Sequence, residues 1–231
     1  MRRDDCLLCA VTDRAWLATD DKTNDKLATQ VARAIAGGAT MIQLREKSLA
    51  PEKIAEAARV LLAVTKSAGV PLIVNDSLEA ALASGADGLH IGQGDGDPSR
   101  ARAALGEGKT LGVSVRTVAQ ALAAERAGAD YLGVGAMFPT ASKDDALPVD
   151  RLELAEICSA VRIPVIAIGG IDALNAPSLA GTGITGVAAI SAVFSRGENI
   201  ESATRELRQA SEIAVARESA VALERARTDA R

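Results

Sequence analysis

Eight short apolar segments recur along this chain of 231 residues, and Ala-rich stretches with helical spacing separate many of them. The expected strands are residues 6–12, 40–45, 71–75, 88–91, 110–113, 131–135, 164–168 and 186–190. Expected helices include residues 27–36, 51–68, 117–127 and 151–160. Strands that alternate with helices pair in parallel through right-handed crossovers, and about 29 residues per unit is typical of a compact barrel. The sequence therefore predicts an α/β fold, a (β/α)8 TIM barrel in a single domain.

The composition fits this architecture. Hydrophobic residues make up 48% of the chain but aromatic residues only 2%, so the core is expected to consist of Val, Ile, Leu and Ala. Such strands suit a parallel sheet that is buried on both faces. We assign residues 1–210 to the catalytic barrel and residues 211–231, which contain no Gly or Pro, to a helical tail. Fraying of this tail and contacts between copies of the chain, as in a homo-oligomer, are both open.

The balance of charges argues against nucleic acids and membranes as binding partners. The chain has 26 basic and 30 acidic residues and a formal net charge of −4, which favours neither a nucleic-acid surface nor a membrane surface. No apolar run is long enough to span a bilayer, and the charges that follow the first short apolar run argue against a signal peptide. A cytoplasmic enzyme that acts on small molecules is therefore expected.

Two of the three cysteines, Cys6 and Cys9, have CxxC spacing, but no second pair follows. If both lie on one strand, positions three apart point to opposite faces of the sheet. This favours a structural role in the barrel over a metal or redox pair.

Charged side chains follow several expected strands at the end where barrel enzymes place their chemistry. Asp76 and Asp95 come after neighbouring strands, and two carboxylates with waters and substrate oxygens are typical of a Mg²⁺ site. Arg45, Lys47 and Lys143 add positive charge to the same rim. Arg binds two phosphate oxygens at once, while Lys acts as a point charge. Together these residues predict a site for a magnesium-bound diphosphate.

A second anion site is expected after the last two strands. Gly169 and Gly170 end one strand, and Ile190 and Ser191 end the next. Barrels often bind a phosphate here, on backbone N–H groups and at a helix N-terminus. One metal-assisted pocket and one metal-free pocket indicate either two phosphorylated substrates or one long substrate.

The chain resembles the thiamine phosphate synthase family over about residues 7–195. The resemblance rests on short segments in the family's order. These are AVTDR (10–14), IQLREK (42–47), LIVND (72–76), GLHIGQGD (88–95), LGVSV (111–115), PTASKDD (139–145), IAIGGI (166–171) and AAISA (188–192). Any one of these segments would be weak alone, but eight at the spacing of barrel strands are highly specific.

The resemblance implies a reaction and a set of site residues. The family joins an aminopyrimidine methyl diphosphate to a thiazole phosphate, with release of pyrophosphate, through a pyrimidine carbocation. Carried over by position, the pyrimidine diphosphate would be contacted by Gln43, Arg45, Lys47, Asn75, Ser114 and Lys143. The thiazole phosphate would be held by Thr140, Ser142, Gly170, Ile190 and Ser191, and Mg²⁺ by Asp76 and Asp95. Ser142 departs from the Thr that is usual in the family, although it keeps the hydroxyl.

Two rival functions and one residue stay open at this point. A thiazole tautomerase-like relative would share the barrel without needing a metal-bound diphosphate. A non-catalytic barrel that binds phosphate ligands would need the anion pockets but no magnesium pair. His90, the only histidine, is either a packed structural residue or a residue that helps to position substrate.

Overall fold

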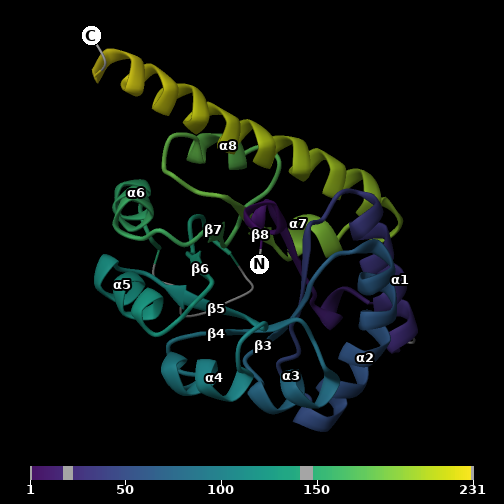
Figure 1. The fold of residues 1–231 in the computed structure, drawn as a ribbon. Coiled ribbons are helices and arrows are strands. Elements are labelled where there is room, and N and C mark those ends of the chain that lie inside the picture. Colours follow the sequence, from purple (N-terminus) through teal and green to yellow (C-terminus); the bar gives the residue numbers. More distant parts are fainter. Residues whose placement is uncertain (1, 18–22, 141–147, 230–231) are drawn as a thin grey trace.

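The computed structural model describes residues 2–17, 23–140 and 148–229, with the backbone alone from residue 217 onward. Eight parallel strands form a closed barrel in chain order, which confirms the predicted fold class. Figure 1 shows the helices outside the ring of strands. The strands are β1 (Leu8–Val11), β2 (Met41–Leu44), β3 (Leu72–Asn75), β4 (Gly88–Ile91), β5 (Thr110–Val115), β6 (Tyr131–Val134), β7 (Val165–Ile168) and β8 (Gly186–Ala189).

Eight α-helices lie in the described part of the chain. They are α1 (Asn24–Ala36), α2 (Pro51–Ala68), α3 (Leu78–Ser84), α4 (Pro98–Leu105), α5 (Val118–Arg126), α6 (Arg151–Ala160), α7 (Ser191–Phe194) and α8 (Ile200–Asp229). Neighbouring residues set where several helices begin. The side chains of Ser77, Thr117 and Asp150 each accept a hydrogen bond from a backbone N–H in the first turn of a helix. None of the described helices is long and apolar enough to cross a membrane.

The connection after β7 differs from the others. It contains only a short 3-10 helix, η3 (Ala176–Leu179), where the other crossovers carry an α-helix. Pro177, Gly181 and Gly183 interrupt helical backbone here, and both glycines have positive φ. Helix α8 packs against η3, α1 and α7, so it covers this part of the barrel and continues beyond it in Figure 1.

The strands are buried on both faces, as expected for a parallel sheet. On β1, Leu8 and Ala10 belong to the outer core beneath the helices, while Cys9 and Val11 point into the barrel. The inner core consists of Cys6, Cys9, Val11, Met41, Ile73, Tyr131, Ile166 and Ala188. Small and branched residues thus fill both layers, in keeping with the low aromatic content.

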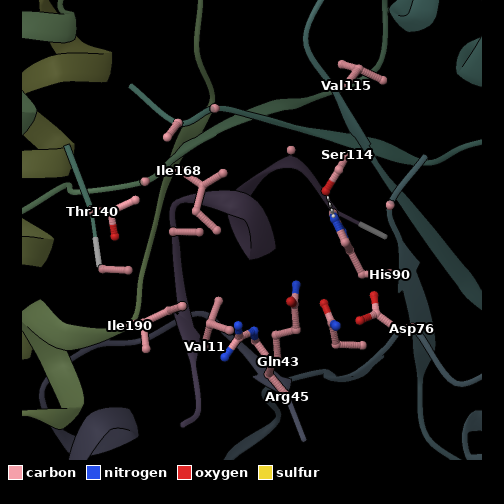
Figure 2. Close-up of a pocket in the computed structure, with 18 of the residues that line it drawn as sticks. Val11, Gln43, Arg45, Asp76, His90, Ser114, Val115, Thr140, Ile168 and Ile190 are labelled. Atoms are coloured by element: carbon pink, nitrogen blue, oxygen red, sulfur yellow. Dashed lines mark hydrogen bonds between the residues drawn. The ribbon is translucent and has the colours of Figure 1, made fainter. Parts of the chain in front are cut away.

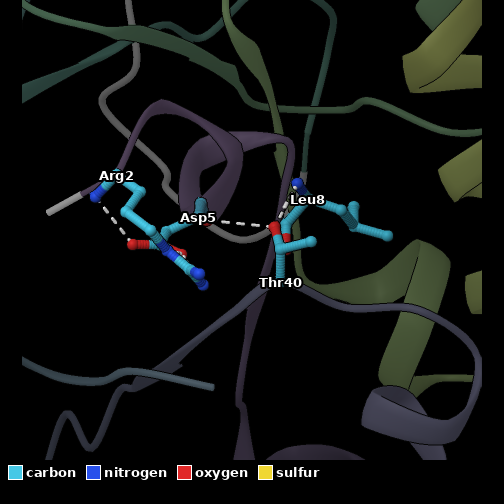
Figure 3. A network of polar contacts seen from close by, with 4 residues as sticks. All are labelled: Arg2, Asp5, Leu8 and Thr40. Atoms are coloured by element: carbon cyan, nitrogen blue, oxygen red, sulfur yellow. Dashed lines mark hydrogen bonds and ion pairs between the residues drawn. The ribbon is translucent and has the colours of Figure 1, made fainter. Parts of the chain in front are cut away.

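The first residues close the barrel at the end where the strands begin. The hydroxyl of Thr40, the residue before β2, accepts from the N–H of Leu8 at the start of β1 at 2.9 Å, and it also contacts the 3-10 helix η1 (Arg3–Cys6). The same hydroxyl lies 3.0 Å from the carbonyl oxygen of Asp5, to which it donates (Figure 3). Arg2 and Asp5 pair at 2.9 Å on the outer side of this turn. At the other chain end, the hydroxyl of Ser211 on α8 donates to the carbonyl oxygen of Leu7 at 2.8 Å.

The two close cysteines require one correction. Cys6 precedes β1 and lies in η1, so the expectation that it points to the opposite face from Cys9 is wrong. Both thiols are buried in the same inner core, and none of the three cysteines forms a disulfide. Burial raises the pKa of Cys6 to about 12 and also raises that of Cys9. High thiol pKa values agree with a structural role, because a thiolate is the form that binds metals and reacts.

Candidate active site

A pocket of about 650 Å³ opens at the carboxyl ends of the strands, the end expected for chemistry. All the predicted site residues in the described part of the chain line this one pocket. They are Gln43, Arg45, Lys47, Asn75, Asp76, Asp95, Ser114, Thr140, Gly170, Ile190 and Ser191. Figure 2 shows several of them pointing into the cavity from different strands. Ser142 and Lys143 lie outside the described residues.

Arg45 is fixed at the rim between β1 and β2. Its guanidinium lies 3.1 Å from the carboxylate of Asp13, and the backbone N–H of Arg45 donates to the hydroxyl of Thr12. Arg14, by contrast, does not line the pocket and pairs with Glu46 at 2.7 Å. Burial raises the pKa of Glu46, and the neighbouring Arg14 opposes this rise. The cations that line the pocket on this wall are therefore Arg45 and Lys47.

Two carboxylates follow the next two strands of the barrel, β3 and β4. Asp76 directly follows β3 with a positive φ of 66°, and its N–H donates to the carbonyl oxygen of His90 at 2.8 Å. Asp95 follows β4, and one of its oxygens accepts from the N–H of Gly92 at 2.7 Å. Both line the pocket, and no group of three His, Cys, Asp or Glu side chains that could hold a metal occurs among the described residues. Two carboxylates without a complete protein cage suit Mg²⁺, which keeps waters and takes substrate phosphate oxygens as further ligands.

A glycine turn after β7 forms the other side of the pocket. Gly169 and Gly170 have φ values of 98° and 63°, which favour residues without a Cβ. A Cβ on Gly170 would lie 2.5 Å from the carbonyl oxygen of Pro139. The side chain of Asn175 donates to the carbonyl oxygen of Gly170 at 2.8 Å and holds the turn in place. Ile190 and Ser191 adjoin this turn in the pocket, although α7, which begins at Ser191, is only four residues long.

A buried polar chain crosses the barrel beneath the pocket. Nδ1 of His90 lies 2.9 Å from the hydroxyl of Tyr131, and Nε2 lies 2.9 Å from the hydroxyl of Ser114. Figure 2 shows the second of these bonds. Burial raises the pKa of Tyr131 well above the ordinary value, and the side chain of Gln43 opposes this rise. One predicted substrate contact, Ser114, is thus joined to two residues that were not predicted as site residues, His90 and Tyr131.

The sequence contained one signal for this chain. Alternation along β6 turns Tyr131 and Gly133 inward, and Gly112 on β5 leaves the space that the two rings occupy. A Cβ on Gly112 would overlap both the Tyr131 ring and the His90 ring. Glycines opposite an inward-facing aromatic residue therefore mark a ring that is packed inside the barrel.

Further polar residues that sequence reasoning did not select also line the pocket, namely Gln93, Arg116 and Gln120. The side chain of Gln93 donates to the carbonyl oxygen of Ser114 at 2.7 Å. Gln120 accepts from the N–H of Arg116 at 2.8 Å, which ties the end of β5 to α5. Arg116 adds a cation to the wall that carries Ser114.

Comparison with known proteins gives consistent matches. The model of a family described as "Thiamine monophosphate synthase" matches residues 8–193. A thiamine-phosphate synthase from Clostridium tetani is 45% identical over 203 residues, which cover 88% of this chain and 94% of that protein. One from Moorella thermoacetica is 48% identical over 180 residues, covering 78% and 85% of the two chains. The solved thiamine phosphate pyrophosphorylase from Pyrococcus furiosus superposes with a TM-score of 0.82 at 36% identity, covering 92% of this chain and 98% of that one.

Proposed function

This chain belongs to the thiamine monophosphate synthase family, and we propose that the pocket at the strand ends binds both substrates of the family's reaction side by side. Its activity is that of a thiamine-phosphate synthase, a transferase of thiamine biosynthesis. The identity to curated synthases, over most of both chains, favours this function over the tautomerase-like and non-catalytic rivals. The proposal rests on one observation. The carboxylates of Asp76 and Asp95 line the same pocket as the cations of Arg45 and Lys47.

The pyrimidine diphosphate is assigned to the side of the pocket between β2 and β5. Arg45 would bind two of its phosphate oxygens, and Lys47 would add a point charge. Asn75 and Ser114 would hydrogen-bond to the same substrate. Asp76 and Asp95 would hold Mg²⁺, which when bound supplies positive charge that stabilises the departing pyrophosphate.

The thiazole phosphate is assigned to the side of the pocket formed by β7 and β8. Gly170 lets the backbone approach a phosphate closely, and Thr140 and Ser191 line the pocket beside it. The two substrates would then meet over the centre of the barrel. This arrangement brings the thiazole nitrogen to the exocyclic methylene of the pyrimidine and so supplies proximity, an effect worth several kcal/mol in favourable cases.

In the proposed reaction, the amino group of the pyrimidine donates electrons toward the methylene as its C–O bond breaks. The pyrophosphate departs with that electron pair, and the thiazole nitrogen then adds to the resulting carbocation. This sequence needs no protein nucleophile and no strong base. The pocket must instead keep water from the cation, and the side chains of Val11, Ile168 and Ile190 supply apolar surface for this purpose.

The proposal is tested by mixing the chain with both phosphorylated substrates and Mg²⁺ and measuring thiamine phosphate and pyrophosphate. The absence of both products at every metal concentration would refute it. Asp95→Ala is expected to lower turnover by at least about 10-fold, because loss of a residue that only supports a metal ligand already costs about 10-fold to 100-fold. Unchanged turnover in this variant would refute the assignment of Asp95 to the metal. The expected cytoplasmic location and assembly into oligomers stay predictions.

A further inference from the structure

We propose that Arg116 binds the distal phosphate of the pyrimidine diphosphate, and that this contact makes the pocket prefer a diphosphate over a monophosphate. Arg116 follows β5 directly and lines the pocket. This inference rests on the proposed function, because it adds a specificity-determining residue for the same substrate.

Arg116 continues the side of β5 that faces into the barrel. A Cβ on Gly112 would overlap the ring of His90, and the hydroxyl of Ser114 lies 2.9 Å from Nε2 of that ring (Figure 2). Val115, which comes between, belongs to the outer core. Because side chains alternate along a strand, the next inward position after Ser114 is Arg116.

Arg116 also lies closer to the mouth of the pocket than Ser114 does. A parallel strand rises about 6.6 Å over two residues, and β5 runs toward the end of the barrel where the pocket opens. The diphosphate must face this opening, because the pyrophosphate leaves through it once the C–O bond has broken. Ser114 is then level with the phosphate next to the pyrimidine, and Arg116 is level with the distal phosphate.

The backbone of Arg116 is fixed while its guanidinium is available to a ligand. Its N–H donates to the side chain of Gln120 at 2.8 Å, and the N–H of Gln120 donates to the hydroxyl of Thr117 at 3.2 Å. Arg14 and Arg45 each pair with a carboxylate, whereas Arg116 pairs with none among the residues that the structure describes. A half-buried guanidinium in this situation can bind two phosphate oxygens at once.

The other charges around the pocket leave a need for this cation. Asp13 faces Arg45 at 3.1 Å and offsets part of its charge, and the carboxylates of Asp76 and Asp95 would offset that of a bound Mg²⁺. A diphosphate carries more negative charge than a monophosphate, and the excess lies on the distal phosphate. Arg116 supplies positive charge for this group from the β5 side of the pocket.

The first test compares the binding of pyrimidine methyl diphosphate and pyrimidine methyl monophosphate by calorimetry, each with Mg²⁺ and without the thiazole phosphate. In Arg116→Gln the dissociation constant of the diphosphate should rise at least about tenfold, as expected for loss of a hydrogen bond between charged groups. The dissociation constant of the monophosphate should stay unchanged. An equal rise for both ligands, or no rise for the diphosphate, would overturn the proposal.

The second test uses inorganic pyrophosphate with Mg²⁺, which probes the same contact without the pyrimidine. Arg116→Gln should again bind this ligand at least about tenfold more weakly than wild type. Arg116→Lys keeps the charge but not the planar fork, and should recover part of the affinity. An affinity in Arg116→Lys no higher than in Arg116→Gln would contradict a contact between charges.

The matched control is Arg126→Gln. Arg126 lies on α5, is exposed, does not line the pocket and has no carboxylate partner in the described part of the chain. This variant should bind all three ligands as wild type does. A wild type that makes no thiamine phosphate would refute the proposed function, whereas equal pyrophosphate affinities of wild type and Arg116→Gln would refute the present inference.

Discussion

The hydroxyl of Thr40 offers a measurable test of how the first turn closes the barrel. Thr40→Val keeps the shape of the side chain but removes the acceptor for the N–H of Leu8, a residue with no exposed surface. A buried N–H left without a partner costs about 1–3 kcal/mol. The added methyl group recovers up to about 0.8 kcal/mol if it is fully buried. The expected net loss in the free energy of unfolding is therefore about 1–2 kcal/mol.

For a chain of this size, each kcal/mol lowers the melting temperature by about 2–4 °C, so the variant should melt about 2–8 °C below wild type. Urea unfolding should show a lower midpoint with an unchanged slope, since the same surface is exposed. Steady-state kinetics should be unaffected, because Thr40 lies at the end of the barrel opposite to the pocket. Thr185→Val serves as the control, because its buried hydroxyl oxygen has no partner to lose. Equal stability of the two variants would refute this account of the Thr40 hydroxyl.

Three further changes should have separable effects. Asp13→Asn removes the charge that faces Arg45 at 3.1 Å, and should raise the KM for the pyrimidine diphosphate by about twofold to tenfold, while an unchanged KM would contradict the positioning role. Gly170→Ala introduces a Cβ at a positive φ of 63°, and should raise the KM for the thiazole phosphate more than that for the pyrimidine diphosphate. Because the pKa of Cys6 is raised from 9.0 to about 12, unfolded chains lose this proton first, so stability should fall as the pH rises from about 9 toward 12. Urea midpoints measured across this range should fall less steeply in Cys6→Ala, and parallel curves would contradict the assignment.

The strands and the rim of the pocket could be predicted because their signals are local. Apolar runs, helix-ending glycines and polar residues at strand ends each depend on a few neighbouring positions. The described site residues reach one pocket because closure of a parallel barrel brings all the carboxyl ends of the strands together. The predicted roles of these residues rest on the family resemblance and stay predictions.

The features that the sequence did not predict depend on contacts between distant segments. Tyr131 and His90 are 41 positions apart, and the glycines that make room for their rings do not indicate which two side chains meet. Cys6 was assigned to the first strand because it is apolar, but the chain turns there so that η1 can fill the end of the barrel. Periodicity reports which face of an element is buried, but it does not identify the residue that packs against that face.

The contact between Ser211 and Leu7 joins residues 204 positions apart, and it links the residue before the first strand to α8. Because β1 also pairs with β8, the first strand gains one of its two neighbours only after the seven later strands have been synthesised. During synthesis, the early βα units therefore have an unpaired strand edge. Such an edge favours chaperone binding and association between nascent chains. Helix α8 follows β8 in the chain, so its contacts with Leu7 and η3 form only after the last strand has been synthesised.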